Sequence, residues 1–247
     1  MSNYAAPRSF SERRVRSAEH LDLPATDERE RARSYHDLDR ISRLPFQFGP
    51  LWRIVRRLAG REAPPGSPIR LLELGAGTGA VGLRIARRLA ARGRRVELLS
   101  SDIRTEQLPP PREGPEQRIV PLRIDLLTDE LPSADVILAN LVVHHFDDRD
   151  VREILRRMAA AATLGAVVYD LERSRRAFHL FRWFFPLWAK SPVTVADSLL
   201  SVQQAFRAEE LMAIAREAGV KVPRVRRYFG LRILLWWETE RPAASQP

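Results

Sequence analysis

The chain has 247 residues and no cysteine, which excludes disulfide bonds and thiolate metal sites. Lysine is nearly absent too: of the 41 lysines and arginines only Lys190 and Lys221 are lysines, which leaves 39 arginines. The formal net charge of +10 favours a nucleic-acid partner in general. Here the arginines are scattered in pairs between carboxylates, and a coding bias toward arginine explains that pattern at least as well. We therefore expect no nucleic acid as a partner.

Long apolar runs are also missing. A transmembrane helix needs ~20 consecutive apolar residues, and the stretch at residues 178–189 is shorter than that and is interrupted by Arg182. The first residues lack the apolar centre of a signal peptide. We expect a soluble, cytoplasmic protein, for which peripheral contact with a membrane stays open.

The length and a hydrophobic content of 45% suit one α/β domain. Its organising stretch is Ile69–Ala80, IRLLELGAGTGA, where an apolar run typical of a buried strand stops at alternating glycines. A helical pattern of apolar residues then follows at positions 81, 83, 85, 86 and 89. Strand, glycine turn and helix are the opening of a nucleotide-binding βαβ unit, in which the turn lets a ligand approach the backbone.

Two cofactor classes fit these glycines. Gly75-x-Gly77-x-x-Ala80 satisfies the dinucleotide fingerprint, but Glu73 would repel a pyrophosphate and suit a cationic ligand. The stretch Glu73-x-Gly75-x-Gly77-x-Gly79 resembles motif I of class I S-adenosylmethionine-dependent methyltransferases, whose cofactor is a sulfonium cation without phosphate. The resemblance implies that the turn binds this cofactor through Glu73, Gly75, Ala76, Gly77 and Gly79.

Two acids end the strands that follow. Asp102 lies 23 positions beyond Gly79, about the distance at which a βαβ unit places an acid for the ribose hydroxyls, although such an acid can also merely cap a turn. Asp125 ends the third strand, where an acid of the resembled family contacts the adenine amino group. The predicted cofactor residues outside the glycine turn are Asp102, Ile103, Asp125, Leu126 and Asn140.

The expected fold is α/β, a Rossmann-like doubly wound sheet of the class I methyltransferase type with a C-terminal antiparallel hairpin. Expected strands cover 96–101, 118–124, 134–140, 164–169, 222–228 and 231–238, and helices follow residue 147 and cover 208–218. Residues 1–34 are expected to be disordered or loosely helical, and 35–60 to form helices that cap the cleft and break near Pro45 and Gly49-Pro50. A linker at 61–68, a core at 69–239 with a helical insertion at 175–205, and a disordered tail at 240–247 complete the organisation.

The run Leu141–Asp148, LVVHHFDD, looks like the Leu-His-His-Leu-x-Asp stretch of the ubiquinone-biosynthesis-like branch of small-molecule methyltransferases. An acceptor that must lose a proton needs a base, and histidine is the side chain best matched to neutral pH. His144 and His145 follow the fourth strand, and we predict that one of them, preferably His145, is that base. The alternative is that they only pack or hydrogen-bond in the loop. Without cysteine or a suitably spaced third ligand, we predict no metal.

The acceptor side is predicted from residues after the fifth strand. Asp170-Leu-x-Arg-Ser and Ser201–Phe206, SVQQAF, look like bacterial methyltransferases of polyketide or quinone pathways. Residues 178–188 contain six aromatic side chains. They predict an apolar lid over the acceptor, a helix packed on the N-terminal helices, or, beside several arginines, a membrane-docking segment. The predicted substrate residues are Tyr169, Asp170, Arg173, Trp183 and Phe184.

We therefore predict methyl transfer from S-adenosylmethionine to an oxygen or carbon of a hydrophobic small molecule, such as an aromatic polyketide or quinone precursor. An NAD-type oxidoreductase of the short-chain kind would need a Tyr-x-x-x-Lys pair, but Pro186 and Glu217 stand four residues before the two lysines. An RNA or DNA methyltransferase of the amino-group type would need Asn/Asp-Pro-Pro-aromatic, but Asn140 is followed by Leu-Val-Val. A protein that binds the cofactor without turnover, the identity of the acceptor and the oligomeric state stay open.

Overall fold

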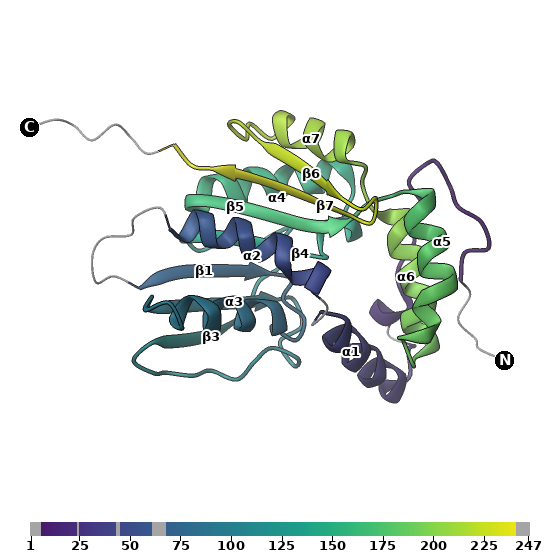
Figure 1. Cartoon of the computed structure of the whole chain (residues 1–247), viewed down its shortest axis with the longest axis horizontal. Coiled ribbons are helices and arrows are strands. Elements are labelled where there is room, and N and C mark those ends of the chain that lie inside the picture. Colours follow the sequence, from purple (N-terminus) through teal and green to yellow (C-terminus); the bar gives the residue numbers. More distant parts are fainter. Residues whose placement is uncertain (1–5, 24, 43–44, 61–67, 241–247) are drawn as a thin grey trace, which may run out of the picture.

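The computed structural model describes residues 6–23, 25–42, 45–60 and 68–240 (Figure 1). The expected linker and tail therefore lie, except for their residues 68 and 240, outside the described residues. Within these ranges seven strands form one sheet in the order β3-β2-β1-β4-β5-β7-β6. The strands are β1 Ile69–Leu74, β2 Val96–Asp102, β3 Gln117–Arg123, β4 Ala134–Asn140, β5 Ala162–Leu171, β6 Arg224–Tyr228 and β7 Arg232–Glu238.

The first five strands are parallel, β7 runs antiparallel to β5, and β6 runs antiparallel to β7. The predicted doubly wound sheet and its terminal hairpin are thus confirmed. From β1 the chain passes to β2 on one side of the sheet and later to β4 on the other side. In open parallel sheets the ligand crevice lies beyond the carboxyl ends of the strands at such a reversal of order.

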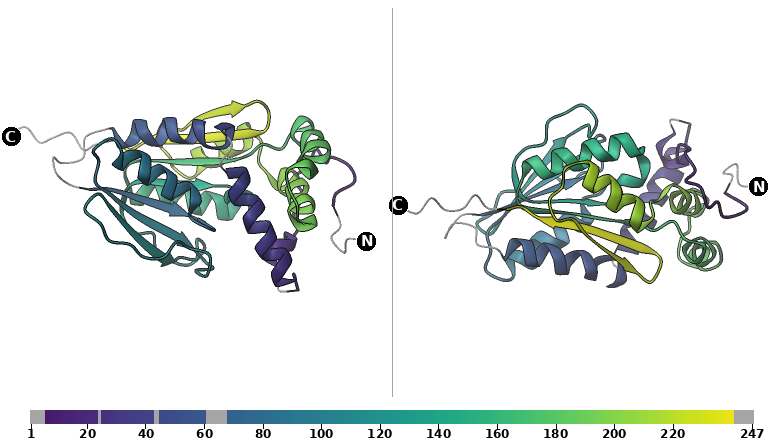
Figure 2. Two further views of the ribbon diagram at one scale, coloured as in Figure 1. Left: turned by 60° about the horizontal axis from the view of Figure 1, so that its bottom comes forward. Right: turned by 90° about the horizontal axis from the view of Figure 1, so that it is seen from above.

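Two helices cover each face of the sheet (Figure 2). On one face, α2 Pro45–Ala59 and α3 Ala80–Ala90 bury apolar side chains such as Leu51, Val55 and Ile85 against it. On the other face lie α4 Asp148–Ala161 and α7 Ala208–Glu217. The predicted helix after residue 147 is present: the Asp147 carboxylate accepts the Asp150 N–H at 2.8 Å and caps the start of α4. This helix buries Val151, Ile154, Leu155 and Met158.

The expected break near Gly49-Pro50 is wrong, because α2 continues through both residues. A proline within a helix removes one backbone hydrogen bond, but it lies in the second turn here. The following residues Leu51, Val55 and Leu58 are fully buried against the sheet. The free energy gained from their burial exceeds the cost of the lost backbone hydrogen bond. The glycine and proline in the sequence do not by themselves show that balance.

A third group of elements lies beyond the carboxyl ends of the strands (Figure 1). It comprises the helices α1 Glu28–Ser42, α5 Arg175–Phe184 and α6 Pro192–Gln204, and the short 3₁₀ helices η1 His20–Asp22, η2 Val143–His145 and η3 Phe185–Leu187. The central helix of this group is α6, which contacts α1, α5, η1 and η2. It buries residues on all sides, including Val193, Val202 and Gln203. The predicted helical insertion is therefore two helices, of which the second organises the others.

The sequence predicted residues 1–34 to be disordered or loosely helical, and residues 6–23 of this range form an N-terminal segment bound to α6. The Val15 N–H donates to the Gln203 carbonyl at 3.1 Å, and the Gln203 side chain donates to the Ser9 carbonyl at 2.9 Å. The Asp197 carboxylate accepts the backbone N–H groups of His20 and Leu21, both at 2.8 Å. Residues 28–34 belong to α1. Backbone hydrogen bonds and individual polar side chains hold this segment in place. Such contacts produce no repeating pattern of apolar residues that could be recognised in the sequence.

Candidate active site

A cavity of about 490 Å³ opens where the sheet order reverses. One wall consists of the loops that follow β1, β2 and β3, which we call the cofactor wall. The opposite wall combines the N-terminal segment, α1, α5, η3 and α6, which we call the acceptor wall. The loop after β4 lies between them. The acceptor wall is mostly apolar, with Leu21, Leu38, Ile41, Phe181 and Phe185.

The three glycines after β1 all have positive φ angles, of 58°, 53° and 66°, but for different reasons. A Cβ at Gly75 would lie 2.4 Å from a methyl carbon of Val142, and one at Gly79 would lie 2.6 Å from a ring carbon of Pro109. These two glycines allow close packing of the protein on itself. At Gly77 a Cβ would meet no atom within 4 Å, and this residue lines the cavity. Gly77 therefore leaves room for a ligand.

The two predicted acids lie on the cofactor wall. The Asp102 carboxylate accepts the backbone N–H of Gly77 at 2.8 Å and that of Arg104 at 3.0 Å. Asp125 accepts the backbone N–H of Leu127 at 2.9 Å. Carboxylate oxygens accept more than one hydrogen bond, so both acids retain capacity for a ligand. The predicted cofactor residues that the fold brings to the cavity are Gly75, Gly77, Asp102, Ile103, Asp125 and Leu126.

The other four predicted cofactor residues, Glu73, Ala76, Gly79 and Asn140, do not line the cavity. Glu73 is buried below the start of α3, where its Oε1 accepts the Gly82 N–H at 3.0 Å. A Cβ at Gly82 would lie 2.2 Å from the other carboxyl oxygen. Burial raises the pKa of Glu73 to about 8, although the hydrogen bonds of Gly82 and Ser100 oppose it. Near neutral pH this group is therefore mostly neutral and does not act as the exposed anion that the sequence suggested.

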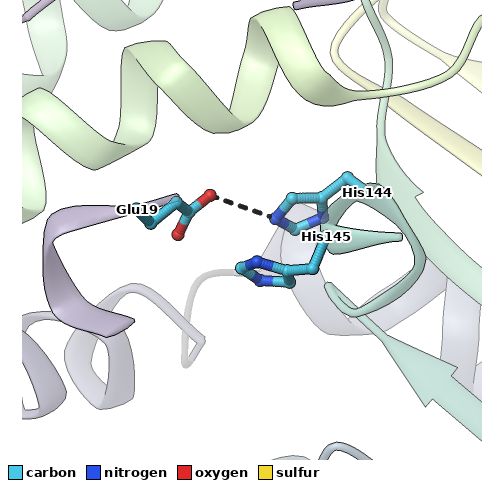
Figure 3. Close-up of side chains that lie close together, drawn as sticks. All are labelled: Glu19, His144 and His145. Atoms are coloured by element: carbon cyan, nitrogen blue, oxygen red, sulfur yellow. Dashed lines mark ion pairs between the residues drawn. The ribbon is translucent and has the colours of Figure 1, made fainter. Parts of the chain in front are cut away.

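His144 lies in the turn after β4, whose first residue, Leu141, has an unusual positive φ of 59°. Its Nδ1 is 2.6 Å from the Asp170 Oδ1. Its Nε2 is 3.6 Å from the Glu19 Oε1, an ion pair that Figure 3 shows. Burial by itself would lower the pKa of His144, but the charges and hydrogen bonds of Asp170 and Glu19 raise it to about 10. His144 is thus an imidazolium ion held between two carboxylates.

The pKa values of the two carboxyl groups, Glu19 and Asp170, shift in the opposite direction. Burial favours the neutral form of Glu19, but its hydrogen bond to His144 and the charges of both histidines lower its pKa. Burial acts in the same way on Asp170, and the charge and hydrogen bond of His144 again lower the pKa of that carboxyl. We call Glu19, His144 and Asp170 the ion triad. It connects the N-terminal segment, the loop after β4 and the end of β5.

His145 differs from its neighbour because its side chain is exposed. The centroids of the two imidazole rings are 4.2 Å apart, at an interplanar angle of 32°. Both histidines line the cavity, but the His144 ring is buried and the His145 ring is exposed. Figure 3 shows the two rings beside Glu19. Of the two, His145 has the more accessible ring.

We predicted no metal because the sequence offers no suitably spaced third ligand beside the two histidines. The fold supplies such a ligand. Glu19, His144 and His145 offer ligand atoms that all lie within 4.8 Å of one another. Two histidines and a carboxylate can bind divalent transition metals. A metal-bound histidine must be neutral, so a metal here would displace the proton that the two carboxylates favour on His144. That no metal binds stays a prediction.

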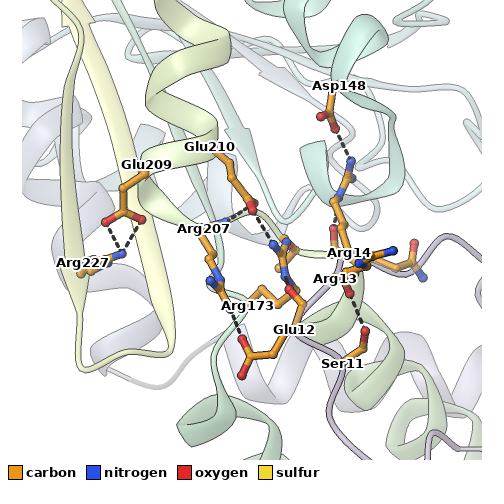
Figure 4. A network of polar contacts seen from close by, with 12 residues as sticks. Ser11, Glu12, Arg13, Arg14, Asp148, Arg173, Arg207, Glu209, Glu210 and Arg227 are labelled. Atoms are coloured by element: carbon orange, nitrogen blue, oxygen red, sulfur yellow. Dashed lines mark hydrogen bonds and ion pairs between the residues drawn. The ribbon is translucent and has the colours of Figure 1, made fainter.

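Arg14 fixes the loop after β4, and sequence reasoning missed it. Its guanidinium donates to the carbonyls of His144 at 3.0 Å and Phe146 at 2.5 Å, and to the Asp148 carboxylate at 2.9 Å (Figure 4). It also covers the Phe206 ring at 3.7 Å from the ring centroid. Glu19, Leu21 and Asp197, which line the cavity, were missed as well. No spacing or motif in the sequence connects these residues with the histidines.

The predicted substrate residues are mostly elsewhere. Tyr169 is buried on the α2 and α3 face of the sheet, and Asp170 lies behind His144. The Arg173 guanidinium donates to the Ala205 carbonyl at 2.6 Å and the Glu210 carboxylate at 2.5 Å, outside the cavity (Figure 4). Trp183 and Phe184 are exposed. The residues of α5 and η3 that line the cavity are instead Phe181 and Phe185.

Comparison with known families adds a domain assignment. Residues 72–168 match a family model described as a methyltransferase domain. This range contains the glycine turn, both strand-ending acids and both histidines. No curated protein matches the chain in sequence.

Solved methyltransferases share the fold at low identity. Human N-acetylserotonin methyltransferase in complex with S-adenosylmethionine matches at 14% identity and a TM-score of 0.57, over 92% of this chain and 63% of that one. The citrinin polyketide synthase CMeT domain matches at 16% and 0.59, over 93% and 60%. A family 2 O-methyltransferase from Planctomyces limnophilus, in complex with apigenin, matches at 17% and 0.56, over 90% and 64%. The chain thus spans about six tenths of the length of these structures, and at these identities they establish its fold.

Proposed function

We propose that the chain is a class I S-adenosylmethionine-dependent methyltransferase that methylates an oxygen or carbon of a hydrophobic small molecule. The proposal starts from the match of residues 72–168 to a methyltransferase domain model and from the fold shared with solved methyltransferases. One observation supports this most: six of the ten predicted cofactor residues and a mostly apolar acceptor wall face each other across one cavity of about 490 Å³. That volume lies within the ~300–1,000 Å³ typical of ligand sites. A cofactor and an acceptor in one cavity can meet in the orientation that an in-line displacement needs.

The proposed cofactor position follows from the cofactor wall. The adenosine lies beside Asp102 and Asp125, and Gly77 admits it without a steric clash. The cavity also contains the carboxylates of Glu19 and Asp197. These favour a sulfonium cation over a pyrophosphate, because opposite charges attract.

His145 is the proposed base. The acceptor loses its proton to the imidazole, its oxygen or carbon forms a bond to the methyl carbon, and the carbon–sulfur bond breaks to leave a neutral thioether. The ion triad does not accept this proton, since His144 is already protonated near neutral pH. We assign His144 a positioning role, in which its contacts with Asp170 and Glu19 hold the loop that carries His145. No metal ion is required for these steps.

The acceptor is proposed to be an aromatic polyketide or a quinone precursor. Leu38, Ile41, Phe181 and Phe185 give the acceptor wall its apolar character. Among proteins of the same fold, one is a methyltransferase domain of a polyketide synthase and another was crystallised with the polyphenol apigenin. The chain's own match to either is too distant to specify the acceptor.

Calorimetric titration tests the cofactor assignment directly. We expect S-adenosylmethionine and its demethylated product to bind, and NAD not to bind. Asp102→Ala should weaken binding by about 1.5–3 kcal/mol, the usual value of a hydrogen bond to a charged group. Tighter binding of NAD would contradict the proposal, as would unchanged affinity in Asp102→Ala. Methyl transfer is then assayed on phenols and 1,3-dicarbonyl compounds, with and without a chelator, and turnover that depends on added metal would contradict the proposed metal-free mechanism.

A further inference from the structure

The side of α5 and η3 that faces away from the cavity is apolar and exposed. Its large side chains recur three or four positions apart and therefore form one stripe along the helix. Their exposed fractions range from 39% for Leu180 to 77% for Leu187, with Trp183 at 69%. The opposite side of α5 is buried at Ala177 and Phe178. We call the exposed stripe the docking face; it consists of Leu180, Trp183, Phe184, Leu187 and Trp188.

Exposed apolar side chains are ordinary when they are single, but a contiguous group of this size usually marks an interaction surface. Phe229, the first residue of the β6–β7 turn, shows the ordinary case, because it is as exposed as Trp183 but is not part of such a stripe. The docking face instead combines two tryptophans, a phenylalanine and two leucines within nine residues. Keeping them in water is costly, so a partner that covers them is expected.

The charge around the docking face specifies the partner's chemistry. Arg175, Arg176, Arg182 and Lys190 are exposed around it, and residues 173–196 contain no aspartate or glutamate. Arg175 pairs with Glu12 of the N-terminal segment at 2.8 Å, and the Lys190 backbone N–H donates to Asp37 of α1 at 2.7 Å, but α5 and η3 themselves contribute positive charge alone. If the docking faces of two copies of the chain met, their arginines and lysines would repel one another. Neither α5 nor η3 carries an acidic residue that could pair with them. The partner must therefore be both apolar and negatively charged.

We propose that the docking face binds the surface of an anionic lipid membrane. Tryptophan and phenylalanine are suited to the boundary between headgroups and acyl chains, and arginine and lysine are attracted to anionic headgroups. Among the described residues no helix is long and apolar enough to span the bilayer. The docking is accordingly peripheral, with α5 lying in the plane of the interface.

The orientation of α5 suggests what membrane binding would do for the reaction. Phe181 and Phe185 line the cavity from the other side of the same element, so about one helix diameter, ~10 Å, separates the lipid surface from the acceptor. A hydrophobic acceptor can then pass from the membrane to the cavity without crossing water. This last step rests on the proposed function, whereas membrane binding does not.

Vesicle co-sedimentation of the full chain, without cofactor or acceptor, tests the docking. The probes are vesicles of phosphatidylcholine alone and of phosphatidylcholine with an equal amount of phosphatidylglycerol. We expect binding to the anionic vesicles and much weaker binding to the neutral ones. Replacing both tryptophans, Trp183→Ser with Trp188→Ser, should reduce partitioning ~10-fold or more. Arg176→Glu should reduce binding to the anionic vesicles by roughly 5-fold or more.

Phe229→Ser is the matched control, because it removes an equally exposed aromatic side chain that is not part of the docking face. It should leave partitioning unchanged, and all variants should retain the melting temperature of the parent because only exposed side chains are replaced. Absence of binding to anionic vesicles would overturn the proposal. So would binding that the tryptophan variant and the control share equally. A parent dimer that the tryptophan replacements convert to monomers, without any vesicle binding, would assign the face to a second copy. Loss of methyl transfer alone would leave the vesicle result unaffected, so the two proposals fail separately.

Discussion

The cofactor wall comes from loops that follow consecutive parallel strands, whereas the acceptor wall comes from segments far apart in the sequence. Gly77 and Asp102 are joined by a backbone hydrogen bond within one βαβ unit. Glu19 and His144 meet only because the N-terminal segment is bound to α6. The first wall is therefore fixed by the sheet, and the second by polar contacts between helices and loops. This difference predicts that changes on the cofactor wall alter affinity, and that changes on the acceptor wall alter turnover or stability.

The largest effect is expected at His145. His145→Ala should lower turnover by about 10²–10⁴, the usual contribution of a general base, and should leave cofactor affinity within a factor of about two, since the ring lies outside the cofactor wall. Single-turnover rates and calorimetric titration measure the two quantities. His179→Ala serves as the control, because His179 is exposed on α5. Parental turnover in His145→Ala would leave this residue a structural part of the loop.

A substitution at Gly77 should instead change cofactor affinity. Gly77→Val should lower affinity for S-adenosylmethionine by ~100-fold or more, because the new side chain fills space in the cavity. Gly93→Val is a matched control: Gly93 also has a positive φ, of 74°, and a Cβ there also meets no atom within 4 Å, but it does not line the cavity. Both variants bear the same type of backbone strain. Equal losses of affinity in the two would show that strain, and not the occupied space, weakens binding.

The next effect is on stability and concerns the ion triad. Asp170→Asn leaves His144 buried with one carboxylate, and breaking a buried ion pair typically costs about 3–5 kcal/mol. In the parent, the folded pKa of His144 is about 10 and the unfolded value is about 6.5. Its contribution to stability is therefore complete below pH ~6.5 and is lost as the pH rises toward 10.

Urea unfolding of parent and Asp170→Asn across this interval measures both effects. Glu153→Gln is the control, because Glu153 forms exposed ion pairs on α4, which are worth less than about 1 kcal/mol. A parent whose stability is constant between pH 6.5 and 10 would contradict the assigned charge of His144.

The smallest effect is expected at Glu73. Glu73→Gln keeps an oxygen that can accept the Gly82 N–H and removes a buried carboxyl whose pKa is raised to about 8. The folded pKa lies above the unfolded one, so the parent loses stability as the pH rises from about 4.5 to 8. The variant should be as stable as the parent at pH 5 and more stable at pH 9, with unchanged cofactor affinity. Affinity that falls tenfold would instead place Glu73 in contact with the cofactor.

The sequence predicted the cofactor wall better than the acceptor wall, for physical reasons. The sheet needs apolar strands, a glycine turn and strand-ending acids in a fixed order, and each leaves a local pattern, as at Gly77 and Asp102. Glu73 matched the motif, but its burial below α3 depends on the third dimension. The acceptor wall depends on single polar contacts, such as those of Arg14 and Glu19, which have no periodicity. In the aromatic segment, residues 178–188, the number of aromatic residues predicted an apolar contact surface. Which of them face the cavity and which face solvent depends on how the helix is rotated about its axis, and the sequence did not show this.

The bond from Arg14 to the Gln204 carbonyl joins residues 190 positions apart in the chain. Contacts of such separation form late in folding, because a long loop must close before they are gained. During synthesis the ribosome must also complete α6 before the N-terminal segment has anything to bind. The glycine turn and both strand-ending acids are synthesised earlier, so the residues of the cofactor wall precede α6, on which the acceptor wall depends. In this protein the order of synthesis therefore separates the two halves of the site in time, as the fold separates them in space.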